Sequence, residues 1–493
     1  MMHGPEKSDS AIVATKPANK AASAAAERVE PRAGTKANAG QSRTQRTQCR
    51  ASVSPGLDRV RQAAKQRKKE KFTALLHHVT ADLLRDAFMA LKRRAAPGVD
   101  GVTWEDYEAG LEGNLRDLHS RVQRGTYRAQ PVRRRYIPKP GTDKQRPLGI
   151  AALEDKIVQR AVVVVLNAIY EEDFLGFSYG FRPGRGQHDA LDALSVAISA
   201  TPVNWILDAD IRSFFDGLSQ DWLVRFMEHR IGDERVLRLV RKWLKAGVLE
   251  DGQWSVSETG TPQGAVASPL LANVYLHYVF DLWALQWRRR EAKGNVVFVR
   301  YADDIVAGFE FEADARRFWD AMRERLVKFG LELHDEKTRL LEFGRNASGR
   351  RRRQGLGKPE TFNFLGFTFI CGRSRRGAFL LRRQTRRDRM RAKLREVKAE
   401  LRRRMHATIP EQGRWLQAVV RGFFAYHAVP TNIRALQAFR HHVTVLWRRA
   451  LQRRSQKGRL TWPRIKRLAD DWLPVPRILH PWPSERFAVT HPR

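Results

Sequence analysis

The sequence predicts an α+β fold in which β-hairpins alternate with helices before a basic, helical C-terminal region. In residues 296–309, two apolar, β-branched runs flank a short acidic turn, which is typical of a hairpin. Further strand signals stand at residues 133–150 and 204–211, with helical stretches between them. After Arg373 the chain becomes strongly basic, and helical apolar spacing dominates.

Length and charge limit the possible functions. The chain has 493 residues, 42% of them hydrophobic, which suffices for two or three domains with buried cores. Lysine and arginine number 91 against 53 acidic residues, a formal net charge of +38. Such a charge makes a polyanion the expected partner, and nucleic acid is the commonest. No stretch is apolar enough to span a bilayer or to form a secretory signal.

The two cysteines, Cys49 and Cys371, are too few and too far apart for a zinc site or a disulfide scaffold. The 14 histidines are mostly scattered and lack metal-ligand spacing. We therefore expect a protein of the reducing cytoplasm.

Most of the remaining chain is expected to be helical. Residues 1–55 have few large apolar side chains and cannot offset the entropy of ordering, so they are predicted to be a disordered basic tail. The C-terminal end of the chain, which has four prolines within residues 474–483, is expected to be extended. Apolar spacing predicts helices over residues 72–93, 104–124, 153–169, 313–330, 414–428 and 432–454, and one after residue 268 to about 290.

Three acidic residues stand at predicted strand ends. Asp303 and Asp304 occupy the tip of the 296–309 hairpin, and Asp210 ends the strand 204–211. Adjacent carboxylates repel each other, so burying them between apolar strands is costly unless a cation neutralises them. Hard, oxygen-seeking ions such as Mg²⁺ suit such a set. Taken singly, the hairpin could be a surface turn that happens to be acidic, and Asp210 a turn cap.

Other segments offer groups that contact nucleotides or nucleic acid. Lys139 and Arg146 would project from the 133–150 hairpin and hold a triphosphate, although solvated surface charge is the commoner role for such residues. Gln263 and Gly264 lie in a Gly/Pro loop that can approach a ligand closely. A basic cluster with few acids is expected to open a long helical region and bind nucleic acid: Arg382, Arg383, Arg386, Arg387, Arg391 and Lys393.

Together these groups suit a two-metal nucleotidyl transferase. One metal would lower the pKa of a primer 3′-hydroxyl, and the other would hold the triphosphate and stabilise pyrophosphate. Lys337 would protonate the leaving group, and Phe215, under the sugar, would select deoxynucleotides.

The motifs resemble those of bacterial group II intron-encoded reverse transcriptase/maturases, from about residue 95 to the C-terminus. Tyr301-Ala302-Asp303-Asp304 is similar to the Tyr-x-Asp-Asp box of that family. Residues 261–273 resemble its Pro-Gln-Gly…Ser-Pro-Leu-Leu block, and residues 210–216 its Asp-Ile-x-x-Phe-Phe-Asp strand. The resemblance implies a right-hand polymerase with fingers at 56–200, a palm at 201–370, and a helical thumb with maturase domain at 371–493.

The resemblance also implies the ligands and partners. Two Mg²⁺ ions, or Mn²⁺ in their place, would be held by Asp210, Asp303, Asp304 and the backbone of Ile211. The partners would be an intron RNA template, a DNA primer or target, and deoxynucleoside triphosphates. The C-terminal region lacks the His-Asn-His module with zinc-binding cysteines, so no DNA endonuclease is expected. Two alternatives stay open: a splicing cofactor without polymerase activity, and a reverse transcriptase recruited to host defence or repair.

Overall fold

The structure is a computed structural model that describes residues 55–138, 145–250, 253–255, 259–261, 264–454 and 460–490. Lys139 and Gln263 lie outside the described residues, and so does almost all of the predicted N-terminal tail. Arg146 is described only by its backbone.

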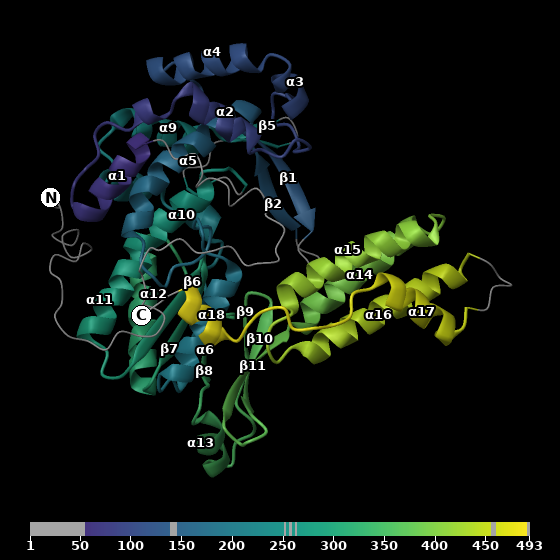
Figure 1. The fold of residues 1–493 in the computed structure, drawn as a ribbon. Helices are drawn as coiled ribbons and strands as arrows, with labels where there is room; N and C mark the ends of the chain where they lie inside the picture. The colour runs from purple at the N-terminus through teal and green to yellow at the C-terminus, as the bar shows by residue number, and fades with distance from the viewer. Residues whose placement is uncertain are drawn as a thin grey trace.

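A four-stranded antiparallel sheet forms the centre of the molecule, in the order β6-β7-β3-β8 (Figure 1). Its strands are β3 (Trp205–Asp210), β6 (Val296–Tyr301), β7 (Asp304–Phe309) and β8 (Arg339–Glu342). The predicted hairpin at 296–309 and the predicted strand at 204–211 are therefore confirmed. Alternate residues of β6 enter different cores: Phe298 packs with the helices on one face, and Val297 and Val299 with α6 and the β9–β11 strands on the other.

A second sheet, in the order β2-β1-β4-β5, lies near the N-terminal helices. It consists of β1 (Val132–Pro138), β2 (Gln145–Ile150), β4 (Val248–Glu250) and β5 (Gln253–Ser255). The predicted hairpin at 133–150 is the antiparallel pair β1–β2. The short strands β4 and β5 were not predicted; β4 joins the sheet through a parallel pairing with β1 that the local sequence does not encode.

A third sheet, in the order β11-β10-β9, connects the centre to the C-terminal helices. Its strands are β9 (Phe362–Phe364), β10 (Phe367–Arg373) and β11 (Phe379–Thr385). Strands β9 and β10 form a tight antiparallel pair, and its turn uses Leu365 and Gly366 at positive φ.

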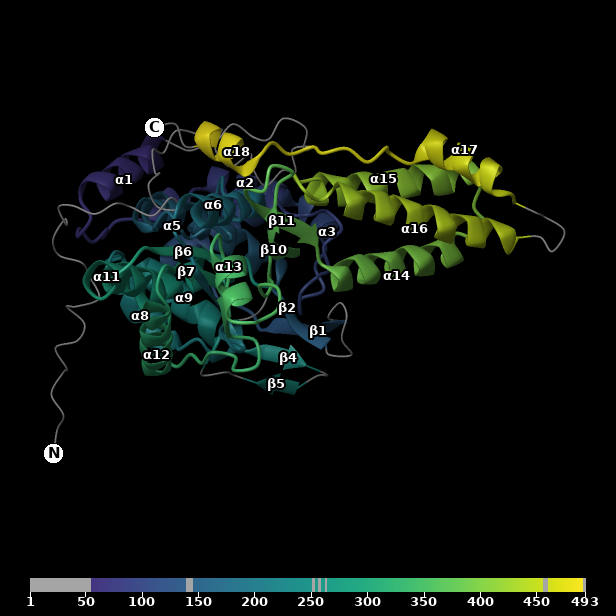
Figure 2. The same cartoon turned by 90° about the horizontal axis from the view of Figure 1, so that it is seen from below.

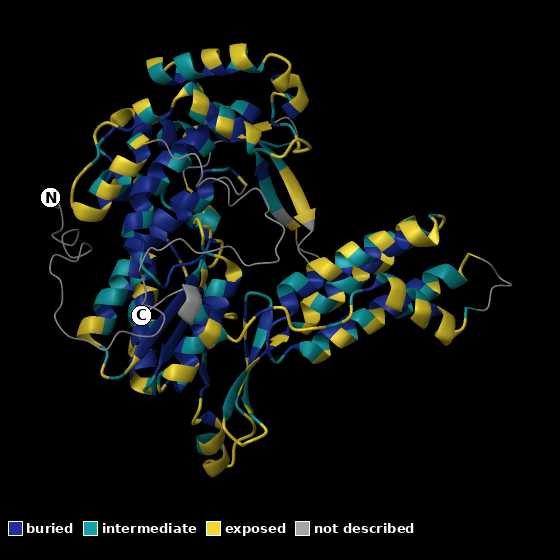
Figure 3. Cartoon of the chain, viewed as in Figure 1, coloured by how far each residue is buried: buried dark blue, intermediate teal, exposed yellow. Residues whose placement is uncertain are grey.

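Helices cover the sheets and account for most of the described residues. Those before the third sheet are α1 (Pro55–Gln66), α2 (Ala81–Met89), α3 (Trp104–Glu108), α4 (Leu111–Arg124), α5 (Leu153–Asp173), α6 (Gln187–Ala200), α7 (Phe214–Gly217), α8 (Gln220–Glu228), α9 (Glu234–Lys245), α10 (Ser268–Leu276), α11 (Leu282–Arg290), α12 (Glu312–Lys328) and α13 (Ala347–Arg353), with the short turns η3 (Leu76–His78) and η4 (His277–Asp281). Buried residues concentrate in α5, α10 and the central sheet, and exposed ones on the outer helix faces (Figure 3). No helix among the described residues combines the length and the apolar composition needed to cross a membrane.

Four C-terminal helices form an arm that projects from the rest of the molecule (Figures 1 and 2). They are α14 (Arg387–Arg403), α15 (Ile409–His427), α16 (Ile433–Gln452) and α17 (Trp462–Trp472), and they share their own core around Trp447. The chain then returns to the central part, where α18 (Pro483–Thr490) lies against α6 (Figure 2).

Three secondary-structure predictions were wrong in detail. The helix expected over 72–93 is broken, because the Asp233 carboxylate accepts hydrogen bonds from the backbone N–H groups of Leu75 and Leu76, and α2 begins only after the N-cap Thr80. The helix expected over 104–124 is split at Gly110. The C-terminal segment with the four prolines is not extended throughout, since α18 begins at Pro483.

Candidate active site

The ends of β3 and β7 bring together acids that are far apart in the chain. Asp210 is directly opposite Asp304 in the antiparallel ladder. Asp303 precedes Asp304 in the β6–β7 turn, where Ala302 adopts a left-handed φ of 57°. Asp208 was not predicted to belong here, but it shares a face with Asp210 because side chains alternate along a strand. The structure therefore places the three predicted acids at one end of the central sheet, with a fourth beside them.

The carboxylates are electrostatically frustrated. Burial by the surrounding elements, and then repulsion by Asp303, Asp210 and Asp208, raises the pKa of Asp304 to about 7. Burial also raises the pKa of Asp208 to about 6, and Asp210 adds to that shift. Asp304 is exposed to solvent at the start of β7, which weakens the effect of burial and leaves repulsion among the acids as the cause that the geometry supports. Arg386, at the start of α14, partly offsets the shifts in both pKa values.

Asp304→Asn is expected to stabilise the protein at pH 8 in the absence of divalent ions. The folded-state pKa of Asp304 is raised from 3.8 to about 7, so its favourable contribution is complete below pH 4 and is lost as the pH rises through 7. After allowance for solvent screening, we expect a gain of about 1 kcal/mol at pH 8 and a smaller one at pH 5. Thermal unfolding at both pH values measures this. The exposed Asp335→Asn is the control, and an equal gain at both pH values would contradict the assignment.

The acids fit a divalent cation by their chemistry, although their present arrangement does not complete its coordination. Among the described residues, no three Asp, Glu, His or Cys side chains are grouped closely enough to hold a metal ion as they stand. One Asp210 oxygen instead pairs with Lys337, which follows a turn fixed by the hydrogen bond from His334 N–H to Asp210 O (2.8 Å). Ile211 is buried and forms a bridge with Leu333. Asp210 Oδ2 would have to leave Lys337 before that oxygen could bind a metal.

Several predicted nucleotide-binding residues lie in neighbouring segments. The Phe215 carbonyl accepts a hydrogen bond from Thr261 N–H (2.8 Å). Gly264, at φ 112°, packs so closely on β2 that an added Cβ would stand 2.7 Å from Leu148 Cδ1 and 2.8 Å from Gly149 O. Phe215 itself is half-buried against Phe214. Thr261 thus contacts the turn after β3, and Gly264 contacts β2, the strand that carries Arg146.

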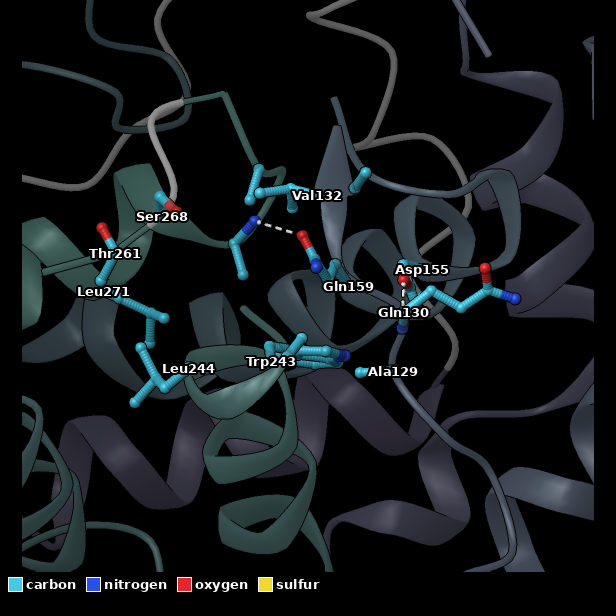
Figure 4. A pocket seen from close by; sticks show the side chains of 14 residues that line it. Ala129, Gln130, Val132, Asp155, Gln159, Trp243, Leu244, Thr261, Ser268 and Leu271 are labelled. Carbon is cyan, nitrogen blue, oxygen red and sulfur yellow. Dashed lines mark hydrogen bonds between the residues drawn. The ribbon is translucent and has the colours of Figure 1, made fainter. Parts of the chain in front are cut away.

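A cavity lies behind this loop (Figure 4). The loop is fixed to α5 there, because Ala267 N–H donates to Gln159 Oε1 (3.2 Å). On the other side, Asp155 accepts hydrogen bonds from Gln130 N–H (3.0 Å) and from the Tyr127 hydroxyl. Burial raises the pKa of Asp155 to about 6. These contacts hold the Gly/Pro loop and the start of β1 on the same helix.

A buried arginine that the sequence analysis missed supports the acidic turn. Arg300 and Asp281 are both fully buried and form a two-point ion pair, with Nε–Oδ1 at 2.7 Å and Nη2–Oδ2 at 2.6 Å. Arg300 Nη1 also donates to Ala302 O (3.0 Å), the carbonyl immediately before Asp303. Asp281 ends the π-helical turn η4, a feature frequent at functional sites. Arg300 therefore holds the backbone of the turn that presents Asp303 and Asp304.

The same arginine connects the aromatic loop at 177–184 to the turn. Arg300 Nη2 donates to Ser178 Oγ (2.7 Å), and Nη1 donates to Asn273 Oδ1 (3.0 Å). Asn273 in turn donates to Gly180 O (2.7 Å). At Gly180 an added Cβ would lie 2.3 Å from Ala302 N, so only glycine allows this approach. The sequence did contain a signal for this role. Arg300 is the one charged residue in the apolar run 296–301, and a charge buried in such a strand needs a partner.

The predicted basic cluster is divided between two elements. Arg382 and Arg383 lie on β11 and not on a helix, which corrects the prediction for both. Arg383 is also buried, with Nη1 2.8 Å from Asp192 Oδ1, so this ion pair removes it from the candidate contacts with nucleic acid. The remaining members precede or belong to α14, and these are Arg386, Arg387, Arg391 and Lys393.

Comparison with known proteins agrees with this geometry. The family described as reverse transcriptase (RNA-dependent DNA polymerase) matches residues 137–369. This range contains the central sheet and the four acids at its end. It ends within β10, before the helical arm.

The chain is similar to several curated proteins. Protein YkfC of Escherichia coli (strain K12) is 34% identical over 321 residues, which cover 59% of this chain and 80% of YkfC. The group II intron-encoded protein LtrA of Lactococcus lactis subsp. cremoris is 34% identical over 235 residues, 48% of this chain and 39% of LtrA. The mitochondrial nuclear intron maturase 3 of Arabidopsis thaliana is 29% identical over 175 residues, 31% of this chain and 24% of that protein. The chain belongs to the reverse transcriptase family and is related to its group II intron-encoded members.

Proposed function

We propose that this protein is an RNA-directed DNA polymerase that uses Asp210, Asp303 and Asp304 in two-metal catalysis. The observation that carries the proposal is the direct opposition of Asp210 and Asp304 across β3 and β7, with Asp303 in the adjoining turn. Its substrates are an RNA template, a DNA primer and deoxynucleoside triphosphates. The family match and the net charge of +38 support a nucleic-acid substrate.

Asp210, Asp303, Asp304 and the Ile211 carbonyl would hold the divalent ions, which would neutralise charge and lower the pKa of the primer hydroxyl. The chain itself orients the reactants. Arg300 fixes the acidic turn through Ala302 O. Positioning of this kind, with electrostatic stabilisation, accounts for most catalysis of phosphoryl transfer.

Basic and aromatic residues around the acids hold the nucleotide and the leaving group. Lys337 is within ion-pair contact of Asp210, where it neutralises one acid and can donate a proton to pyrophosphate. Lys139, Arg146 and Gln263 bind the triphosphate in this proposal. Phe215 lies under the sugar, and Gly264 permits close approach of the backbone.

We also propose a maturase role in which the protein binds its own group II intron RNA and promotes splicing and retrohoming. The similarity to LtrA and to nuclear intron maturase 3 supports this role. In this proposal residues 56–200 are the fingers, 201–370 the palm, and 371–493 the thumb and maturase domain. In this proposal Arg387, Arg391 and Lys393 of α14 contact RNA.

Primer extension on an RNA template tests the polymerase proposal. Purified protein, a labelled DNA primer, deoxynucleotides and Mg²⁺ are expected to give full-length DNA, and EDTA is expected to abolish it. Ribonucleotides in place of deoxynucleotides should extend the primer poorly, and Phe215→Ala should relax that preference. An RNA-binding protein that extends no primer with Mg²⁺ or Mn²⁺ would favour the splicing-cofactor alternative. Efficient extension without any effect on intron splicing would favour a host role.

A further inference from the structure

One end of the molecule carries many cations and almost no acids. Between Phe343 and Arg382 the chain has nine arginines and one lysine against a single acid, Glu360. We use the name arginine knob for the exposed cations of α13, of the segments on either side of it, and of the closed end of the β10–β11 hairpin: Arg345, Arg352, Arg353, Lys358, Arg373, Arg375 and Arg376.

Strand register places the knob away from the acids. Glu342, the last residue of β8, is opposite Trp205, at the end of β3 remote from Asp210. With about 3.3 Å per residue, this is about 16 Å along the strand. The β10–β11 hairpin likewise has its open end at Thr385, next to Arg386, and its closed end a strand length away. Figure 1 draws α13 and the closed end together, away from β1–β2 and from the helical arm, and Figure 2 also draws α13 beside β10 and β11.

The segment that carries α13 is anchored at its base. Phe343 and Phe362, at its two ends, pack edge to face with ring centroids 4.9 Å apart, and Phe362 stacks on Phe369 of β10. Gly344 N–H donates to Cys371 Sγ (3.3 Å), which ties the segment to β10. Arg350 Nε binds Glu342 Oε1 (2.8 Å) and so orients α13. The cations beyond this point project from a fixed support.

The hairpin end is also fixed. Ser374 N–H donates to Ala378 O (2.8 Å), and Gly377 N–H donates to Ser374 O (3.0 Å), with Gly377 at φ 80°. This turn presents Arg375 and Arg376 side by side at its tip, where both are exposed.

Several arginines of α12 are neutralised by nearby acids, whereas most cations of the knob are not. On α12, arginines pair with acids one turn away, as in Arg316–Glu312 and Arg323–Asp320. Within the described residues no ion pair is formed by the knob's Arg352, Arg353, Lys358, Arg373, Arg375 or Arg376. Unneutralised like charges repel, and an external polyanion relieves that repulsion.

We infer that the arginine knob is a docking surface for folded RNA, distinct from the catalytic site. Arginine supplies almost all of its charge, and the guanidinium fork binds phosphates at two points and stacks on unpaired bases, both of which folded RNA offers. A bilayer fits less well, because Leu356 is the one large exposed apolar side chain between residues 343 and 382 in the part of the chain described. The inference concerns binding and does not depend on polymerase activity.

The test compares a variant that lacks three charges of the knob with a control variant that lacks three charges elsewhere on the surface. The knob variant is Arg353→Gln, Arg375→Gln and Arg376→Gln. The control variant is Arg289→Gln, Lys293→Gln and Lys328→Gln, three exposed cations near α11 and on α12. The full-length protein is first saturated with a short DNA-primed RNA template. Binding of a three-way-junction RNA with a blocked 3′ end is then measured across salt concentrations, with a DNA junction of the same sequence in parallel.

The knob variant is expected to bind the RNA junction about tenfold more weakly at physiological salt, with a salt slope lower by about 2. The control variant should match wild type, and both should extend the short primer normally. Equal losses in the two variants, or no loss in the knob variant, would overturn the inference. Equally tight binding of the DNA junction would overturn the assignment to RNA, and a parallel loss of primer extension would overturn the separation from the catalytic site.

Discussion

Replacing Asp303 and Asp304 with alanine is expected to lower DNA synthesis by at least about 10³-fold while leaving RNA affinity within about twofold of wild type. The two carboxylates lie at the β6–β7 turn beside Asp210, so their loss removes most of the charge available to hold divalent ions. The basic surfaces that we propose to bind RNA lie on other elements, α14 and the arginine knob, and are unchanged by this substitution.

The measurement is single-turnover primer extension, with RNA affinity determined on the same preparations. Asp470→Ala with Asp471→Ala is the matched control, because it removes the same charge from the exposed surface of α17. The double variant at 303 and 304 should be at least as stable as wild type at pH 8, since the repulsion that raises the pKa of Asp304 is gone. Parallel losses of synthesis and RNA binding would refute the division between catalytic acids and basic binding surfaces.

Arg300→Met is expected to destabilise the central part of the protein by about 3–5 kcal/mol and to reduce polymerase activity further than unfolding explains. The substitution leaves Asp281 buried without its counter-charge, which is the costly way to break a buried ion pair. It also frees Ala302 O, so the acidic turn loses a contact that fixes its position. Arg300→Lys retains the charge but cannot reproduce the contacts with Asp281, Ala302 and Ser178 together.

A double-mutant cycle separates the two effects. Arg300→Met, Asp281→Asn and their combination are compared by thermal unfolding and by primer extension at 20 °C, a temperature chosen to keep every variant folded. The combined variant should regain part of the stability lost in Arg300→Met, because no lone charge is left buried. Its activity should stay low, since Ala302 O still lacks its donor. Recovery of activity together with stability would show that Arg300 acts only in folding.

The sequence by itself determined the local elements of the site. Two apolar, β-branched runs around Asp303–Asp304 predicted the β6–β7 hairpin, because strands buried on both faces are apolar at nearly every position. The order and spacing of the motifs identified the family, which the comparisons confirmed. The net charge pointed to a polyanionic partner, because charge is a property of composition and not of fold.

Only the tertiary structure decided which distant residues meet. The opposition of Asp210 and Asp304, the pairing of β4 with β1, and the Arg300–Asp281 ion pair all depend on contacts between segments far apart in the chain. The same holds for Arg383, which belongs to a basic run in the sequence and yet lies buried against Asp192 of α6. The local sequence indicates whether a segment is polar enough to be solvated. Which residue a buried side chain binds depends on how the whole domain packs. For that reason the sequence predicted the acids that we propose to be catalytic, but not the arginine that holds their turn in place.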